Sequence, residues 1–494
     1  MVQRRVLAAA GWAIVVLCAS RFAQADSRDY LDVVRAYADA MIEHGRDTYG
    51  PAESPLFAAA LDRRTLRLPE GESLRRVEGI SRSQWGVRPH DRTLTGANPM
   101  HDQNLYQVLY ALAQWTGERK YAEEADAALR WFFEHCQSPA TGLMAWGEHM
   151  GWDFRTEGPI RDVHEFARPW VLWDRCYELA PEACRRFASG VRQHQIADLE
   201  TGRFSRHAAY SKHAPGRGYE FPRHGGFYIA TWASAYERTG DAELLKAVEA
   251  LSESFDERRN AASGAIPAET ATPELCWPPS NLSLAIDLED SAAKLPDDLG
   301  AKMRAGAART DAVFLKIGHE LEPGGRGFLS TAITSTLDPG RARGGGSGFF
   351  TETWSTGYGQ WTDAQVAMFC LLRWQQVKAE GYEKLFLAAA DRYLASEPDA
   401  SRVVWPGAMG DAITLLVEVH RITGDRKYLD RADRLGRVAV DLFFPDDSPL
   451  PKASSQHDHY EAITRADTLA MALVSLWAAK HKPGLALGMT WPER

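Results

Sequence analysis

The stretch GAMGDAITLLVEVHRITGDRKYLDRADRLGRVAVDLF, residues 407–443, decides the fold. Apolar residues recur in it at intervals of three and four, which is the period of an amphipathic helix. Thr423-Gly424-Asp425 interrupts this period. Gly424 suits the left-handed backbone that ends one helix, and Asp425 suits the positively polarised start of the next. The stretch therefore predicts two antiparallel helices joined by a tight turn.

The same two-helix pattern recurs along the chain. It is present in residues 103–135, 226–255 and 361–396, each with a glycine at the turn. In each hairpin one helix is apolar nearly all round and the other is more charged, which predicts buried inner helices inside an outer amphipathic layer. About fourteen helical segments, one of them over residues 161–180, have the helical period. They make six or seven hairpins, enough to close a ring.

An open superhelix is the alternative to a closed ring, because repeats of about 35–50 residues are typical of both solenoids and closed arrays. Irregular repeat lengths and long, motif-rich loops favour the closed ring, with the loops at the rim of a cleft. These loops span residues 76–100, 138–160, 200–225, 257–279 and 320–360.

Residues 1–25 have the features of a secretory signal peptide. Two arginines precede an apolar run of about fourteen residues, and an Ala-x-Ala cleavage site ends at Ala25. An uncleaved anchor is the alternative. We expect residues 26–494 to form a single catalytic domain that is exported to the periplasm or outside the cell. No second apolar run is long enough to span a membrane.

Composition narrows the class of partner. The formal net charge of −9 argues against nucleic acid. Sixteen tryptophans and sixteen tyrosines suit a cleft that stacks on sugar rings, although large helical cores also use tryptophan. The cysteines that follow the predicted signal peptide are odd in number and irregularly spaced, so we expect small buried residues rather than a disulfide framework or a zinc site. They are Cys136, Cys176, Cys184, Cys276 and Cys370.

The hairpin pattern resembles the (α/α)-toroid carbohydrate-active enzymes, which include several polysaccharide lyase families, unsaturated glucuronyl hydrolases and sugar 2-epimerases. Short stretches resemble bacterial pectate-lyase-like proteins: DTYGP at 47–51 with SPLF at 54–57, and YGQWTDAQ at 358–365. The resemblance implies an all-α fold, an (α/α)6–7 toroid with long loops at the rim of the cleft, that acts on a carbohydrate. It assigns no catalytic residue, so the site residues are inferred from the chain itself.

The segment from Arg206 to Gly226 is the strongest candidate site. Seven cationic or imidazole side chains and two tyrosines fall within it, in an acidic protein. Arginine binds carboxylates through two parallel hydrogen bonds, as an anionic sugar requires. Removal of the C5 proton of a uronate builds negative charge that cations neutralise, while an imidazole, a phenol or an activated arginine takes the proton. The predicted catalytic residues are His207, Tyr210, Tyr219, Arg223 and His224.

Other loops supply predicted binding residues. Asp102 is a plausible N-cap before the helix at 103–116. A helix over 161–180 places His164 and Arg168 on one face, four residues apart. Histidine and carboxylate ligands suit a divalent metal ion, for which we predict His101, Glu148 and His164. The predicted substrate-binding residues are Trp146, Trp152, Arg155, Arg168, Arg217, Glu352, Trp354, Trp361 and Asp363.

Three hypotheses remain open at this stage. The first is an exported lyase that cuts an anionic, pectate-like polysaccharide by β-elimination. The second is a glycoside hydrolase on the same scaffold, in which two carboxylates face each other across the cleft. Its candidates are Glu148, Asp153, Glu269, Glu274, Glu352 and Asp363. The third is a sugar- or protein-binding toroid without catalytic activity.

Overall fold

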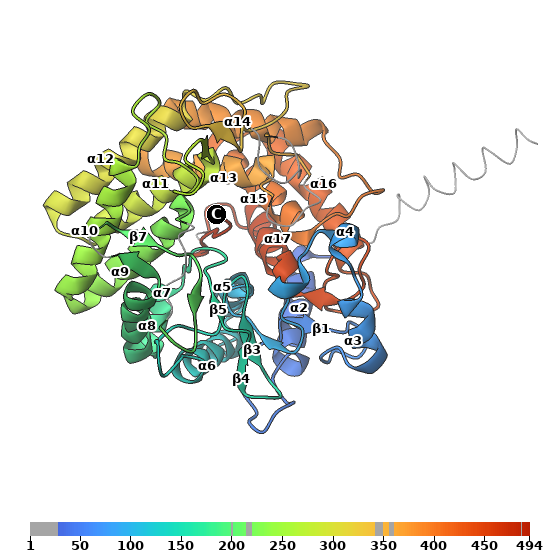
Figure 1. Ribbon diagram of the computed structural model, residues 1–494. Helices are drawn as coiled ribbons and strands as arrows, with labels where there is room; N and C mark the ends of the chain where they lie inside the picture. Colours follow the sequence, from blue (N-terminus) through green and yellow to red (C-terminus); the bar gives the residue numbers. More distant parts are fainter. Residues whose placement is uncertain (1–27, 199–200, 214–219, 341–348, 355–359, 486) are drawn as a thin grey trace, which may run out of the picture.

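The computed structural model describes residues 28–198, 201–213, 220–340, 349–354, 360–485 and 487–494. Helices arranged in a closed ring make up most of it, and the last residues of the sequence lie near the centre of this ring (Figure 1). The predicted ring of helical hairpins is confirmed. The inner helices are α5 (Gln103–Thr116), α9 (Pro222–Thr239), α11 (Pro278–Ala292), α13 (Asp363–Val377), α15 (Pro406–Thr423) and α17 (Ala466–His481).

An outer layer of helices surrounds this inner set. Between α5 and α9 the wall is completed by α6, the short α7 (Trp173–Leu179) and α8, which pack against one another in turn. The outer helices are α2 (Tyr30–His44), α6 (Lys120–His135), α8 (Pro181–His194), α10 (Ala242–Glu257), α12 (Asp297–Phe314), α14 (Glu380–Ala395) and α16 (Arg426–Phe443).

Three of the four glycine turns form as the sequence predicts. Gly117, Gly240 and Gly424 end α5, α9 and α15 with φ of 75°, 66° and 70°, a left-handed conformation that a glycine adopts without steric cost. Asp241 and Asp425 then cap the following helices, accepting hydrogen bonds from the backbone N–H groups two residues on. These three turns are therefore specified locally. The fourth predicted glycine, Gly381, lies inside α14, and Lys378 with a φ of 54° ends α13 instead.

Helix α17 closes the ring by packing between α15 and α5. On the α15 side the two backbones approach closely at Gly410, where a Cβ would lie 2.8 Å from the backbone nitrogen of Leu469. On the α5 side Asp467 accepts the N–H of Asn104 at 3.0 Å. Asp102 occupies the N-cap position of α5 but accepts the Tyr460 hydroxyl instead, so the predicted cap is wrong and the real one comes from the other end of the chain.

One predicted helix is wrong. Residues 161–172 are irregular apart from the strand Val163–His164, and α7 begins only at Trp173. Arg161 has a φ of 69° and Pro169 lacks an amide hydrogen, and both oppose a continuous helix. His164 and Arg168 therefore do not share a helical face. Two further helices, α3 (Gly71–Glu78) and α4 (Arg82–Trp85), lie in segments that the sequence analysis left without a helix.

Short antiparallel sheets connect the loops on the cleft side. One pair joins the two ends of the chain, since β1 (Ala60–Leu61) pairs with β11 (Tyr460–Glu461). The others are β2 (Gly96–Ala97), β3 (Gly151–Asp153) and β4 (Gly158–Ile160); β5 (Val163–His164) with β8 (Ala208–Ala209); β6 (Ile196–Asp198) with β7 (Arg203–Phe204); and β9 (Leu275–Cys276) with β10 (Ala332–Ile333). Two 3-10 turns, η1 (Pro89–Asp91) and η2 (Ala462–Thr464), complete the elements.

Two bulk predictions can be compared with the described residues. All five cysteines among them are unpaired and buried, as expected for small core residues. Within the same residues, no helix is both long enough and apolar enough to cross a membrane. The predicted signal peptide lies outside the described residues.

The close contact at Gly410 yields a stability prediction. Gly410→Ala places a methyl group against the backbone of α17, and we expect the free energy of unfolding to fall by about 1–3 kcal/mol. Gly318→Ala is the matched control, because that glycine is exposed and a Cβ there meets no atom within 4 Å. Urea unfolding followed by circular dichroism measures both. Equal stability of the two variants would show that the helices do not approach as described.

Asp467 makes stability depend on pH. Burial, with a further contribution from Glu493, raises the pKa of its carboxyl to about 7 although Arg168 opposes the shift. The unfolded chain releases this proton near pH 4 and the folded chain keeps it to near pH 7, so stability falls across about pH 4–7 by up to about 1.4 kcal/mol per pH unit. Asp467→Asn should remove this component. Unfolding from pH 4 to 8 tests it, with the exposed Asp298→Asn as control; parallel curves for Asp467→Asn and the parent would contradict it.

Candidate active site

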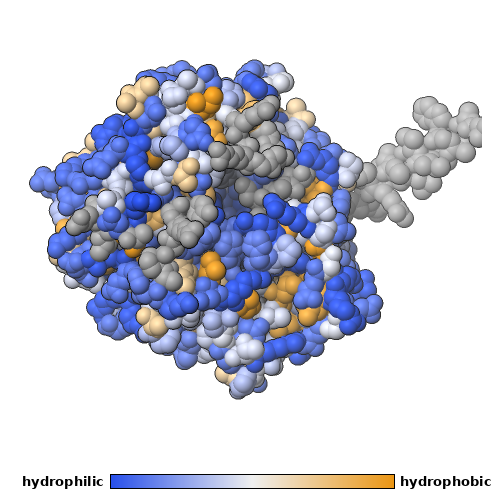
Figure 2. Space-filling model, in the orientation of Figure 1, coloured by the Kyte–Doolittle hydropathy of each residue, from blue (hydrophilic) through white to orange (hydrophobic). Residues whose placement is uncertain are grey.

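The middle of the ring contains a cleft whose surroundings are mainly hydrophilic on the face shown in Figure 2. Loops that precede the inner helices and the last residues of the chain line it together. Residues that are distant in sequence therefore meet there. They include His101, Glu148, Arg168, Arg223, Trp361, Trp405, Arg465, Glu493 and Arg494.

Strand register places Glu165 beside His207. In the antiparallel pair of β5 and β8, His164 lies opposite Ala208. Glu165, the residue after His164, therefore lies opposite His207, the residue before Ala208. His207 Nε2 lies 2.8 Å from Glu165 Oε2. Because side chains alternate along a strand, His164 points into the core while Glu165 points towards the cleft. His164 accepts a hydrogen bond from Trp146 Nε1 and is fully buried.

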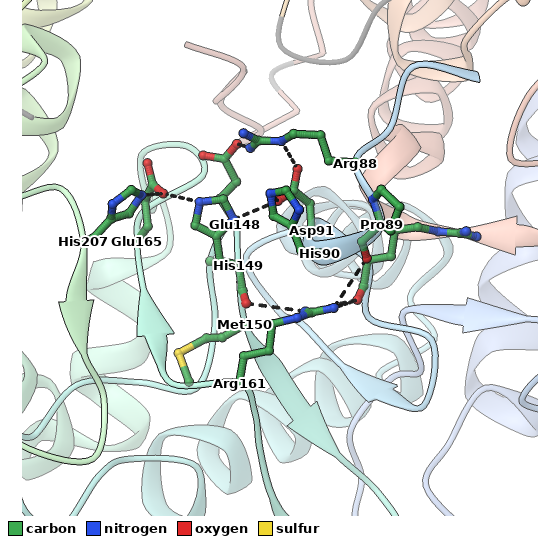
Figure 3. Close-up of polar contacts among 12 residues, drawn as sticks. Arg88, Pro89, His90, Asp91, Glu148, His149, Met150, Arg161, Glu165 and His207 are labelled. Carbon is green, nitrogen blue, oxygen red and sulfur yellow. Dashed lines mark hydrogen bonds and ion pairs between the residues drawn. The ribbon is translucent and has the colours of Figure 1, made fainter. Parts of the chain in front are cut away.

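A third loop brings His149 to the same carboxylate. Gly147 forms a parallel bridge with Glu165, at a φ of 115° and with no space for a Cβ, so a glycine is required there. His149 Nε2 then lies 2.9 Å from Glu165 Oε2 (Figure 3). Arg161 contacts the backbone oxygens of both Pro89 and His149 at 3.4 Å and thus joins this loop to η1.

Glu165 is the centre of the cluster. Its Oε1 accepts from Arg206 and lies 3.2 Å from His224 Nε2. Burial opposes ionisation of this carboxyl, but the surrounding imidazoles of His149, His207 and His224 hold its pKa well below its usual value. His224 itself is buried in the first turn of α9, and burial lowers its pKa to about 4. Glu165 is therefore an anion at neutral pH.

Asp91 orients His149. Its Oδ1 lies 2.7 Å from His149 Nδ1, and its Oδ2 accepts from Arg88 Nε at 2.5 Å (Figure 3). Burial disfavours the charged form of Asp91, but the bond from His149 and the charge of Arg88 hold its pKa below the usual value. Burial opposes protonation of His149, but its hydrogen bonds to Asp91 and Glu165 raise its pKa to about 9, so the ring carries a proton on each nitrogen at neutral pH. A cation bound at Nε2 would replace the proton on that nitrogen, while Asp91 would keep the one on Nδ1. This is how second carboxylates orient metal-binding histidines.

Glu148 lies next to the cluster and lines the cleft. It accepts a hydrogen bond from Arg88, and Arg206 Nη1 is 3.9 Å from its second oxygen. Burial, followed by repulsion from Glu165, raises its pKa to about 7. Arg206 in turn lies against the Phe221 ring, with 4.6 Å from Cζ to the ring centroid.

The donor set fits a divalent cation. The ligand atoms of His149, Glu165 and His207 all lie within 4.8 Å of one another, and so do those of His90, Asp91 and His149. Glu165 Oε2 is buried and makes no hydrogen bond of normal geometry, as expected of an oxygen that binds a cation instead. Two imidazoles and a carboxylate are ligands that first-row transition metals accept. Within the described residues, His101, Glu148 and His164 do not form such a group.

The structure brings together part of the predicted site. His207 and His224 contact Glu165, while Arg168, Arg223, Trp361, His101 and Glu148 line the cleft. Arg217 and Tyr219 lie outside the described residues. Tyr210 is placed elsewhere: its hydroxyl lies 3.4 Å from the backbone oxygen of Cys136, in the core.

The remaining predicted binding residues lie away from this cleft. Trp146 is fully buried among aromatic rings, and Trp152 packs edge-on against Trp131. Arg155 forms an exposed ion pair with Glu70. Glu352 and Trp354 line a separate depression, while Asp363 is buried and accepts hydrogen bonds from two threonines and Arg392. A high local content of aromatic and charged residues in the sequence therefore did not distinguish residues of the core from residues of the cleft.

Sequence reasoning missed Glu165, His149, Asp91 and Arg88 as site residues. A strand around Val163–His164, had it been predicted, would have identified Glu165. Side chains alternate along a strand, so Glu165 and His164 point in opposite directions. The link between Asp91 and His149 spans 58 positions and has no local signature in the sequence.

One family model matches part of the chain. Residues 76–226 match the family model described as periplasmic pectate lyase, a segment that contains the whole His149–Glu165–His207 cluster. The resemblance to pectate-lyase-like proteins is thereby confirmed, and the match supports an enzyme that acts on polysaccharides.

Solved structures of sugar-active proteins are similar over most of the chain. Cellobiose 2-epimerase from Bacillus thermoamylovorans shares 9% identity over 91% of this chain and 99% of its own, with a TM-score of 0.45. An unsaturated glucuronyl hydrolase specific for heparin shares 12% over 92% and 98%, with a TM-score of 0.47. An α-1,6-mannanase from Salegentibacter shares 10% over 91% and 99%, with a TM-score of 0.43. At these identities no residue role is transferred.

The cluster predicts metal binding that can be measured. We expect isothermal titration with MnCl₂ to detect a site that Glu165→Gln abolishes, because the variant loses the charged ligand. Asp91→Asn should weaken the affinity by about 10–100-fold, the effect typical of a lost orienting carboxylate. The exposed His44→Gln is the control and should bind as the parent does. Unchanged affinity in Glu165→Gln would place any bound ion elsewhere.

Proposed function

We propose that this chain is a lyase that cleaves a uronate-containing, pectate-like polysaccharide by β-elimination. The observation that carries the proposal is the cluster of His149, Glu165 and His207 beside Glu148, which lines the same cleft as Arg168 and Arg223. The match of residues 76–226 to periplasmic pectate lyases supports it.

The reaction determines what the cleft has to supply. A base removes the C5 proton of a uronate, the electron pair forms the C4–C5 double bond, and the C4–O bond breaks as the leaving oxygen takes up a proton. Negative charge accumulates on the C6 carboxylate before the bond breaks, and preorganised cations stabilise that charge. A cleft lined by arginines meets this requirement, because a guanidinium binds a carboxylate through two parallel hydrogen bonds.

His149, Glu165 and His207 would hold a divalent cation beside this carboxylate. When bound, such a cation polarises the carboxylate and makes the C5 proton more acidic. Asp91 would keep the proton on His149 Nδ1 while Nε2 binds the cation, and Glu165 holds Arg206 in place through Oε1. Each of these residues thus positions a charge before the substrate arrives.

Two side chains beside the cluster are candidates to exchange the proton, Glu148 and Arg206. Glu148 lines the cleft, and Arg206 lies between Glu165 and Glu148. His207 and His224 are less suited to this role than the sequence analysis expected. Both imidazoles face Glu165, and the Nε2 of His224 also contacts the backbone oxygen of Phe166 at 3.1 Å.

The cellular location of the protein is argued from its predicted signal peptide and from the family match. We propose that residues 1–25 are a signal peptide and that residues 26–494 are a single catalytic domain exported to the periplasm or beyond. The match to a family described as periplasmic supports this location. N-terminal sequencing of the exported protein tests the cleavage after Ala25.

Turnover on polygalacturonate tests the reaction. Ultraviolet absorbance should report an unsaturated product. Of the variants Glu148→Gln and Arg206→Lys, the one that removes the group exchanging the proton should lose about 10²–10⁴-fold in kcat. Glu352→Gln is the control, since that carboxylate lies in a separate depression beside Arg402 and should leave the rate unchanged.

Other products would overturn the proposal. New reducing ends without ultraviolet absorbance would indicate a glycoside hydrolase. Binding without either product, on polygalacturonate and on other uronate polymers, would indicate a sugar-binding toroid without catalysis.

A further inference from the structure

The last residues of the sequence enter the centre of the ring, where the mark for this end lies in Figure 1. Trp491, Glu493 and Arg494 are buried there, and Glu493 and Arg494 line the same cleft as Glu148 and Arg223. This tail is therefore part of the wall that a substrate meets.

Specific polar contacts hold the tail in place. Trp491 Nε1 donates to Asp411 at 3.0 Å, and the backbone of Thr490 exchanges hydrogen bonds with the side chain of Gln107. Glu493 accepts from Asn104 and Thr468 at 3.0 and 2.6 Å. The same carboxylate pairs with Arg168 at 2.5 Å and with Arg465 at 3.3 Å. So many contacts to one short segment fix the position of its side chains.

The two cleft arginines of this wall differ in how far their donors are used. Arg494 donates Nη1 to Asp287 at 2.5 Å, but its Nε is buried without a hydrogen-bond acceptor. Arg465 donates Nη2 to Asp411 at 2.8 Å, and its Nη1 lies 3.3 Å from Glu493 Oε2 in an ion pair without the geometry of a hydrogen bond. Buried, unsatisfied donors of charged groups are costly, and a bound anion would satisfy them.

One counter-charge of each of these two arginines lies behind the cleft wall, whereas Glu493, which also pairs with Arg465, is in the lining. Asp287 and Asp411 are buried, at 1% and 0% exposure, and neither lines the cleft. The side chains of the lining include four guanidinium groups and two carboxylates. The guanidinium groups belong to Arg168, Arg223, Arg465 and Arg494, and the carboxylates belong to Glu148 and Glu493. An anion in the cleft therefore meets cations directly.

The size and the remaining lining of the cleft indicate what kind of anion fits. The space within the cleft is about 160 Å³. Trp361 and Trp405 also line it, and indole faces stack on sugar rings. A single acidic sugar unit, with its ring on an indole and its carboxylate towards the arginines, matches this combination of donors and aromatic surface.

We propose that Arg465 and Arg494 form a subsite that binds the carboxylate of a hexuronate unit, so that the tail of the chain contributes to substrate recognition. The proposal rests on the proposed function for the class of substrate. It assigns Arg494 as a specificity-determining residue that selects the free acid over its neutral methyl ester. It involves no covalent step.

Binding measured without turnover tests the subsite. In a Glu165→Gln background, calorimetry would compare trigalacturonate with its methyl ester. We expect Arg494→Gln to weaken trigalacturonate binding about tenfold or more, the effect of one lost charge-assisted pair, and to change ester binding less than about twofold. Arg494→Lys should be intermediate, because it keeps the charge without the planar fork. The exposed Arg130→Gln is the matched control and should bind both ligands as the parent does.

Several outcomes overturn the subsite. They are an equal loss for acid and ester, no loss in Arg494→Gln, or no binding of trigalacturonate by the parent. Inorganic phosphate that competes as strongly as trigalacturonate, and that also depends on Arg494, would replace a uronate subsite with a general anion site. Thermal unfolding shows whether Arg494→Gln is folded; if it is not, the comparison of Arg494→Lys with the parent decides.

The subsite and the reaction can fail separately. Elimination on polygalacturonate with a KM that Arg494→Gln leaves unchanged would retain the lyase and reject the subsite. Selective loss of acid binding in Arg494→Gln, in a chain that forms no unsaturated product, would retain the subsite on a uronate-binding protein and reject the lyase.

Discussion

Closure of the ring by α17 is the constraint on which the rest of the structure depends. This helix packs against α15 and α5, and its Asp467 accepts the first free N–H of α5 through Asn104. The pairing of β1 with β11 adds backbone hydrogen bonds between the two ends of the chain. Only a closed ring brings the loops before its inner helices into one place, because an open superhelix would place them along a groove.

The charged side chains in the centre of the ring stabilise one another by forming ion pairs. Glu165 is buried, yet it remains ionised because imidazoles and Arg206 surround it. Ion pairs such as Arg168 with Glu493 and Arg494 with Asp287 recur on the opposite wall. Buried pairs of this kind stabilise a fold weakly, since desolvation offsets much of their attraction. Their persistence in the cleft is better explained by the charges that a bound substrate would need.

The two walls of the cleft have different origins in the chain. The wall with His149, Glu165 and His207 comes from short strands whose register sets each side chain, and it lies inside the segment that matches pectate lyases. The wall with Arg465 and Arg494 comes from the residue that precedes α17 and from the last residues of the sequence, outside that segment. A division between a reaction wall and a recognition wall is consistent with both proposals.

Periodicity along the chain is enough to predict the helical hairpins, and it favours a closed ring over an open superhelix. Helical periodicity and glycine turns such as Gly424 are local, so each hairpin is specified within about forty residues of the chain. The sequence also located the basic segment that contains His207 and His224. Which residues meet depends on tertiary contacts. Glu165 rather than His164 lies beside His207 because β5 is a strand paired with β8, and Arg494 lines the cleft because Asp411 and Asp287 bind the last residues of the sequence. Such contacts join positions that are tens to hundreds of residues apart, and no periodic pattern in the sequence encodes them.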